Sequence, residues 1–136
     1  MGAQSIVYME NDLTRLIKPT KLAASVRESH NDFSFDHSYW SFDEKDDHYA
    51  DQDQVFRDLG SDVVNSAFQG YNCCCFAYGQ TGSGKTFTMM GTKADPQKEG
   101  LVPRICQALF NRMNSGQDEG TGYKTQVSYL EITMKK

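Results

Sequence analysis

The sequence predicts an α/β fold in which helices flank a sheet. Segments with the two-residue period of strands alternate with segments of helical period. A glycine-rich stretch at residues 79–86 also stands between a strand-like run and a short helix-like run, as in phosphate-binding loops of such folds. At 136 residues, the chain is expected to form one domain or part of one. Its net charge of −4 argues against nucleic acid or an anionic membrane surface as partner.

Residues 1–31 are predicted to form a small N-terminal region containing a hairpin. Residues 6–9 and 13–17 are β-type runs, and Asn11-Asp12 between them is a turn signal. Residues 32–40 alternate aromatic and polar side chains in their first half, which predicts a half-buried strand with Phe33 and Phe35 on or near its covered side. The acidic segment 41–54 that follows is expected to be a solvated loop.

Two amphipathic helices are predicted. The first covers residues 52–69, with Asp51 or Asp53 as cap and Gly70 at its end. Gly60 lies inside it and should weaken it by about 1 kcal/mol. The second covers residues 102–114. The first helix is predicted to pack through one apolar stripe, formed by Val55, Phe56, Leu59, Val63, Ala67 and Phe68.

Two further strands are predicted at residues 72–78 and 123–133. Cys73, Cys74 and Cys75 fall in the first of them, so their side chains alternate between its two faces and cannot readily converge on one metal ion. Buried, reduced cysteines are the expected outcome, which fits a cytosolic compartment. No segment has the length and apolar character of a membrane span, and no signal peptide pattern opens the chain.

The stretch from Gly79 to Thr86 fits the pattern G-x-x-x-x-G-K-[ST] at every fixed position. Glycines allow the tight turn that brings several backbone N–H groups close to phosphate oxygens. Lys85 is expected to reach the β- and γ-phosphates, and the Thr86 hydroxyl to ligate Mg²⁺. The sequence therefore predicts a nucleotide site, with these phosphate-binding residues: Gly79, Gln80, Thr81, Gly82, Ser83, Gly84, Lys85 and Thr86.

From Phe33 onward the sequence resembles the N-terminal half of a kinesin motor domain. The most specific residues are Phe76-Ala77-Tyr78 with the loop that follows, together with Phe87-Thr88-Met89-Met90-Gly91. Matching pieces occur in the same order at Phe33-x-Phe35-Asp36, at residues 54–56, 100–104 and 127–132. The stretches 39–41 and 87–91 look most similar to the vesicle-transport subfamily with phospholipid-binding tails.

The resemblance implies an ATP-driven microtubule motor with the family's phosphate-loop α/β fold. It implies ATP and Mg²⁺ as cofactors, tubulin as partner, and a location in the cytoplasm on the cytoskeleton. Phe87 would lie against the adenine; the alternative is a core aromatic at the start of a helix. The insertion at 94–99 matches the family's variable loop beside the nucleotide site.

The sequence departs from the family pattern in several places. The R-x-R-P motif of a central strand and the switch motifs N-x-x-S-S-R and D-x-A-G-S-E do not occur in it. We therefore expect residues 32–136 to be the phosphate-loop portion of a partial motor domain, with an incomplete sheet. The strand at 72–78 should then have an unpaired edge and uncovered apolar surface. No catalytic residue is assigned, and this polypeptide is expected to bind nucleotide weakly and to hydrolyse it negligibly. Microtubules would be bound by parts of a motor that this sequence does not contain, and no membrane contact is expected.

Two other functions remain open from the sequence. The chain could be a truncated or alternatively spliced remnant that does not hydrolyse ATP. It could instead be an unrelated phosphate-loop nucleotide kinase or GTPase, although a guanine-reading N-K-x-D motif does not occur.

Overall fold

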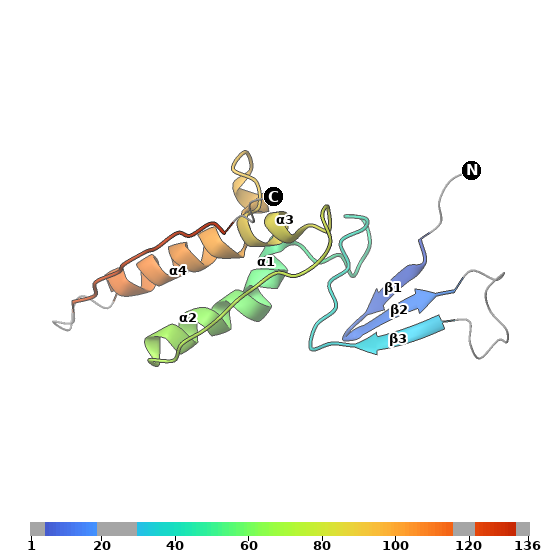
Figure 1. The fold of residues 1–136 in the computed structure, drawn as a ribbon, viewed down its shortest axis with the longest axis horizontal. Helices are drawn as coiled ribbons and strands as arrows, with labels where there is room; N and C mark the ends of the chain where they lie inside the picture. Colours follow the sequence, from blue (N-terminus) through green and yellow to red (C-terminus); the bar gives the residue numbers. More distant parts are fainter. Residues whose placement is uncertain (1–4, 19–29, 116–121, 133–136) are drawn as a thin grey trace.

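The structure is a computed structural model that describes residues 5–18, 30–115 and 122–132. A small antiparallel sheet lies at one end of the molecule, and the longer helices lie at the other (Figure 1). None of the helices in these ranges combines the length and apolar character needed to cross a bilayer. The elements in chain order are β1 (Val7–Glu10), β2 (Leu13–Ile17), β3 (His30–Ser34), α1 (Gln52–Val55), the π-helical turn η2 (Phe56–Gly60), α2 (Ser61–Phe68), α3 (Lys85–Met90), the 3-10 helix η3 (Pro96–Lys98) and α4 (Leu101–Ser115).

β1 and β2 form the predicted hairpin, and β3 adds to it as an antiparallel third strand. Asn11 in the turn has a left-handed φ of 52°, which asparagine tolerates better than most residues. Arg15 of β2 lies opposite Asp32 of β3, and the guanidinium Nε and Nη2 each donate to one carboxylate oxygen at 2.7 Å. This cross-strand pair fixes the register of β3 against the hairpin.

The third strand is shorter than predicted. β3 ends at Ser34, which pairs with Leu13, the first residue of β2. Because β2 has no earlier residue to pair with, the chain leaves the sheet there instead of continuing to residue 40. Phe33 and Phe35 are 45% and 56% exposed, so the predicted covering of these rings was wrong. The division of the domain between residues 31 and 32 stays a prediction.

The first predicted helix is confirmed, although its hydrogen bonding changes along its length. α1, η2 and α2 follow one another without a break from Gln52 to Phe68. The Asp51 side chain caps the start by accepting from the backbone N–H of Gln54 at 2.7 Å. Gly70 follows the end with a left-handed φ of 81°.

Gly60 has a packing role that its helix propensity does not reveal. A Cβ at this position would lie 2.3 Å from Cδ2 of Phe56. The glycine therefore makes room for the aromatic ring of the residue four positions earlier, at the point where η2 widens the helix.

The second predicted helix is confirmed as α4, which is one residue longer at each end than expected and contacts α2, η2 and α3. The buried apolar side chains of the described residues are Val64 of α2 and Leu101 of α4, which are 6% and 3% exposed. The core therefore sits between these helices and is small.

The strands predicted at 72–78 and 123–133 are not formed. Both segments are extended over their described residues, but neither pairs with another strand of the described chain. The first segment runs alongside α2 and the second runs alongside α4 (Figure 1). In the second, Oγ1 of Thr125 contacts Sδ of Met113 at 3.4 Å. Extended backbone becomes a strand only when a neighbour shares its hydrogen bonds.

The three consecutive cysteines are exposed because the segment that carries them pairs with no described strand. Cys73, Cys74 and Cys75 lie on the unpaired segment, and Cys106 lies on an outer face of α4. The prediction that the first three are buried was wrong in this structure. The expected uncovered apolar surface is confirmed, because Phe76 is 81% exposed and Tyr78 is 95% exposed.

Candidate nucleotide-binding site

The predicted phosphate loop forms one compact turn between the extended segment that ends at Tyr78 and the start of α3 at Lys85. The backbone N–H of Ser83 donates to the carbonyl of Gln80 at 3.2 Å and closes the turn. Gly82 and Gly84 have left-handed φ values of 82° and 90°. An L-residue is strained in this region because its Cβ approaches the carbonyl oxygen. The shape of the loop therefore depends on glycine at both positions.

Gly79 has a φ of 157°, which L-residues rarely adopt, and it also leaves space in the turn. A Cβ built on it would lie 2.5 Å from Oγ of Ser83. Any side chain here would displace Ser83 or fill the concave side of the turn. Gly79 therefore supplies both an unusual backbone conformation and open space, whereas Gly84 supplies the conformation alone.

Lys85 closes the loop from its C-terminal end. Its Nζ donates to the carbonyl oxygens of Gly79 and Gln80, each at 2.7 Å. The ammonium group therefore lies against the loop backbone, with one of its three donors not used by these two bonds. An anion entering the turn would meet a positive charge already held there.

The other predicted site residues lie where the motif suggests. Gln80, Thr81 and Ser83 are exposed on the loop, and Thr86 is exposed in the first turn of α3. The structure thus brings all of residues 79–86 together. Which atoms touch a phosphate or Mg²⁺ stays a prediction.

Phe87 faces a hollow of about 480 Å³ beside the loop rather than the loop itself. Its side chain is 49% exposed. The lining contains no residue of 79–86, and it includes Tyr39, Tyr49, Gln52, Val55, Phe87 and Lys98. Contact between Phe87 and adenine stays a prediction.

A second hollow, of about 520 Å³, lies near the hairpin turn and away from the loop. It is lined by Tyr39, Trp40 and several carboxylates. The Tyr39 hydroxyl donates to Oδ2 of Asp58 at 3.1 Å. Burial, followed by this hydrogen bond, raises the pKa of Tyr39 to about 12. The hollow is polar and has no part of the phosphate loop in its wall.

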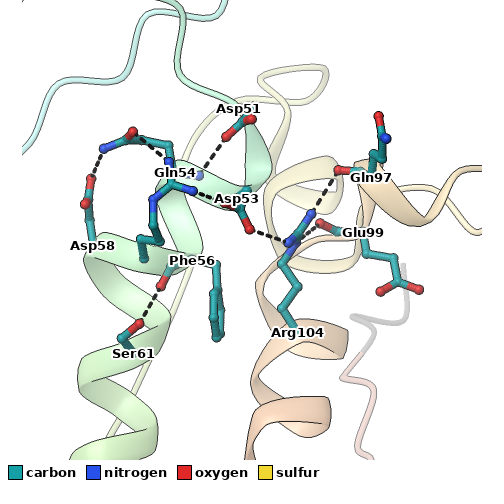
Figure 2. A network of polar contacts seen from close by, with 10 residues as sticks. Asp51, Asp53, Gln54, Phe56, Asp58, Ser61, Gln97, Glu99 and Arg104 are labelled. Atoms are coloured by element: carbon teal, nitrogen blue, oxygen red, sulfur yellow. Dashed lines mark hydrogen bonds and ion pairs between the residues drawn. The ribbon is translucent and has the colours of Figure 1, made fainter.

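Two side chains that the sequence did not single out contact α3 and the segment that follows it. The amide of Gln52 donates from Nε2 to the carbonyl of Phe87 at 2.7 Å. Arg104 donates from Nη1 to Oδ1 of Asp53 at 3.0 Å, from Nε to the carbonyl of Glu99 at 2.9 Å, and from Nη2 to the carbonyl of Gln97 at 2.9 Å. Figure 2 shows this guanidinium between the first turn of α1 and the segment that follows α3.

These residues carried no functional signal in the sequence. Arg104 belongs to the matching series at 100–104, but the series gave it no role. Gln52 precedes the apolar stripe of its helix and reads as an ordinary polar residue. Only the spatial neighbours of the two side chains identify them as supports of the loop.

Known proteins resemble this chain over nearly its whole length. Residues 2–136 match the family description "Kinesin motor domain". The chain is 60% identical over 134 residues to the kinesin-like protein Klp98A of Drosophila melanogaster, which covers 97% of this chain and 10% of that protein. It is 48% identical over 138 residues to human KIF16B, with 97% of this chain and 10% of that protein covered.

A solved structure has a similar fold. The KIF14 motor with ADP, in complex with a microtubule, aligns with a TM-score of 0.72 and 36% identity, covering 85% of this chain and 29% of that one. This confirms the predicted fold class, and the relatives overturn the alternative of an unrelated nucleotide kinase or GTPase. The chain spans about a tenth of the length of Klp98A and KIF16B. By sequence and by fold, it belongs to the kinesin motor domain family.

Proposed function

We propose that residues 79–86 bind the phosphates of ATP as part of an ATP-driven microtubule motor. One observation carries the proposal: residues 79–86 form a turn closed by the bond from Ser83 to Gln80, and Nζ of Lys85 lies 2.7 Å from two of its carbonyl oxygens. Membership of the kinesin family is the reason to expect ATP rather than another phosphate ligand. The KIF14 structure, described with ADP on a microtubule, supports the choice of partner.

The residues of the loop fit a triphosphate with its magnesium ion. The concave side is kept open at Gly79, where a Cβ would come within 2.5 Å of Oγ of Ser83. On binding, Lys85 would exchange its two carbonyl acceptors for phosphate oxygens, a stronger charge-assisted interaction. The Thr86 hydroxyl is an oxygen ligand of the kind that Mg²⁺ prefers.

Bound Mg²⁺ neutralises charge on the phosphates, and the protein contributes positioning. Within this chain, the loop backbone would orient the phosphates and Lys85 would hold their charge. Phe87 would offer its half-exposed ring to the base. We assign no catalytic residue to this chain.

Hydrolysis and microtubule binding are proposed to belong to the complete motor. Its location would be the cytoplasm, on the cytoskeleton. The isolated 136-residue polypeptide should show no microtubule-stimulated ATPase, because the two switch motifs do not occur in its sequence. An ATPase at motor rates from this polypeptide, abolished by Lys85→Ala, would contradict that assignment.

Nucleotide binding to the complete protein that the gene encodes tests the proposal. A fluorescent ATP analogue is titrated in the presence of Mg²⁺, first on the wild type and then on Lys85→Ala. Loss of a charge-assisted contact should weaken binding by at least about tenfold. Lys45→Ala is the matched control, because Lys45 is also an exposed lysine but lies outside the loop and lines neither hollow.

Competition and sedimentation complete the test. ATP should compete with the analogue, and the wild type should co-sediment with microtubules. Equal affinity in the wild type and Lys85→Ala, or a strict requirement for guanine, would refute the proposal.

A further inference from the structure

We infer that the first turn of α1 is the anchor that positions the phosphate-loop helix α3, with Gln52 and Asp53 as positioning residues. The inference rests on the proposed function. Gln52 lies 35 positions before Phe87 in the chain, yet its Nε2 donates to the Phe87 carbonyl at 2.7 Å. Gln52 is only 8% exposed. Because Phe87 comes two residues after Lys85, this bond fixes the helix that carries the lysine.

α3 depends on such contacts because it is short. It contains six residues, and an isolated helix of this length is not stable in water. The extended segment before the loop supplies no sheet contact, since it pairs with no strand of the described chain. Tertiary contacts must therefore set the position of α3, and the buried amide of Gln52 makes one of them directly.

Asp53, the next residue, anchors the other end of α3 through Arg104. The guanidinium is 17% exposed and joins Oδ1 of Asp53 to the carbonyls of Gln97 and Glu99. Those carbonyls belong to the segment that leaves α3. Figure 2 shows the side chain of Asp53 directed at the Arg104 guanidinium.

The segment that leaves α3 comes back into contact with the C-terminal end of this helix, and the close approach occurs at Gly91 and Gly100. Gly91 forms an antiparallel bridge with Glu99 and has a left-handed φ of 68°. A Cβ on Gly91 would lie 2.1 Å from the carbonyl oxygen of Lys98, and one on Gly100 would lie 2.6 Å from the backbone of Met89. Such close backbone contact passes any shift of the Arg104-bound segment to α3. Two adjacent residues of α1 thus hold both ends of the phosphate-loop helix.

The test removes the hydrogen bond of Gln52 without removing its volume. Gln52→Met keeps the length of the side chain but has no N–H donor. In the complete protein, Kd for a fluorescent ATP analogue should rise about tenfold, because the loss of one buried hydrogen bond lets Lys85 move. Amide exchange at Thr88 and Gly91, which donate to carbonyls of Gly84 and Phe87 at 2.8 Å, should become faster.

Gln54→Met is the matched control. Gln54 lies in the same helix, but its Nε2 donates to Oδ2 of Asp58 at 3.0 Å and does not reach α3. The control should keep wild-type affinity and wild-type exchange in α3. Equal weakening by both substitutions would overturn the inference, as would wild-type affinity in Gln52→Met, even if exchange in α3 were faster.

Arg104→Lys tests the second contact in a variant that keeps the charge. A lysine ammonium cannot span the three acceptors of a guanidinium fork, so binding should weaken about threefold or more. Arg112→Lys on the same helix is its control, because Arg112 donates to Asn65 and lies over the Phe68 ring, away from α3. Wild-type affinity in Arg104→Lys would overturn the role given to Asp53.

Lys85→Ala separates the inference from the proposed function. If Lys85→Ala binds as the wild type does, or if the wild type binds no nucleotide, the proposed function fails and the inference fails with it. If Lys85→Ala weakens binding and Gln52→Met does not, only the anchor is refuted.

Discussion

Replacing Gly84 with alanine should weaken nucleotide binding, whereas the same replacement at Gly70 should not. The two glycines have left-handed φ values of 90° and 81°. A Cβ at either position would meet no other atom within 4 Å. The cost of each substitution is therefore backbone strain without a steric clash, about 1–2 kcal/mol for an L-residue in this region.

The two strains act at different places. Gly84 directly precedes Lys85, so relief of strain there moves Nζ away from the carbonyls of Gly79 and Gln80. If nucleotide binds only to the left-handed form of the loop, the binding free energy becomes less favourable by the full strain energy. Kd should then rise about 5- to 30-fold. Gly70 follows α2, so Gly70→Ala should lower the free energy of unfolding by about 1–2 kcal/mol and leave Kd unchanged.

Titration of a fluorescent ATP analogue and thermal unfolding of the same samples measure both quantities. The expected result is a loss of affinity confined to Gly84→Ala. Wild-type affinity in Gly84→Ala would refute the claim that nucleotide binding requires this loop geometry. An equal loss in Gly70→Ala would show that general destabilisation, rather than the shape of the loop, lowers affinity.

Three further predictions concern pH and association. The pKa of Tyr39 is raised to about 12, so above pH 10 the folded state keeps a proton that the unfolded state loses. The free energy of unfolding should therefore fall between about pH 10 and 12. Tyr39→Phe should show a smaller fall than the wild type when both are followed by thermal unfolding across that range. Hydrogen bonding to Arg15 lowers the pKa of Asp32, so the pair should stabilise the sheet above the usual aspartate pKa and lose this effect as pH falls through the lowered pKa. Asp32→Asn should therefore melt slightly earlier than the wild type at about pH 7, and this difference should shrink as the pH is lowered. The isolated 136-residue polypeptide should self-associate through uncovered apolar groups such as Tyr78, which is 95% exposed; a concentration-independent monomer with a cooperative thermal transition would contradict this.

Local signals in the sequence predicted the parts of the fold that depend on neighbouring residues. The hairpin follows from two β-type runs and an Asn-Asp turn, and the cap of α1 follows from Asp51. The phosphate loop follows from a motif whose contacts lie within a few residues of one another. Lys85, for example, bonds to carbonyls five and six positions earlier in the chain.

The buried face of the first helix differs from the predicted apolar stripe, because the helix contains a π-helical turn that the sequence did not indicate. A regular helical period placed Val63 and Leu59 on the covered face, but Val64 is the buried valine and Leu59 is 39% exposed. The π turn η2 has more residues per turn than an α-helix. It therefore shifts the covered face by about one position. The buried positions of this helix are 52, 60 and 64.

The predicted strands depended on distant partners, which local signals in the sequence do not specify. The apolar character of 72–78 indicates that the segment belongs in a sheet, but it does not say what lies beside it. Pairing is a non-local property, and no other described strand reaches this segment. The side chains of Cys73 to Cys75 are exposed in consequence.

The phosphate loop keeps its shape although the segment leading into it has no neighbouring strand among the described residues. Its turn at Gln80 and Ser83 and its lysine contacts are internal, so the geometry of the cradle is a local property of residues 79–86. Affinity needs more than geometry, because a cradle that moves loses entropy when it closes on a ligand. In the described chain, the bonds that restrain α3 come from Gln52 and, through Arg104, from Asp53. Substitution at Gln52 can therefore separate the shape of the loop, which is encoded locally, from its rigidity, which depends on a residue far away in the sequence.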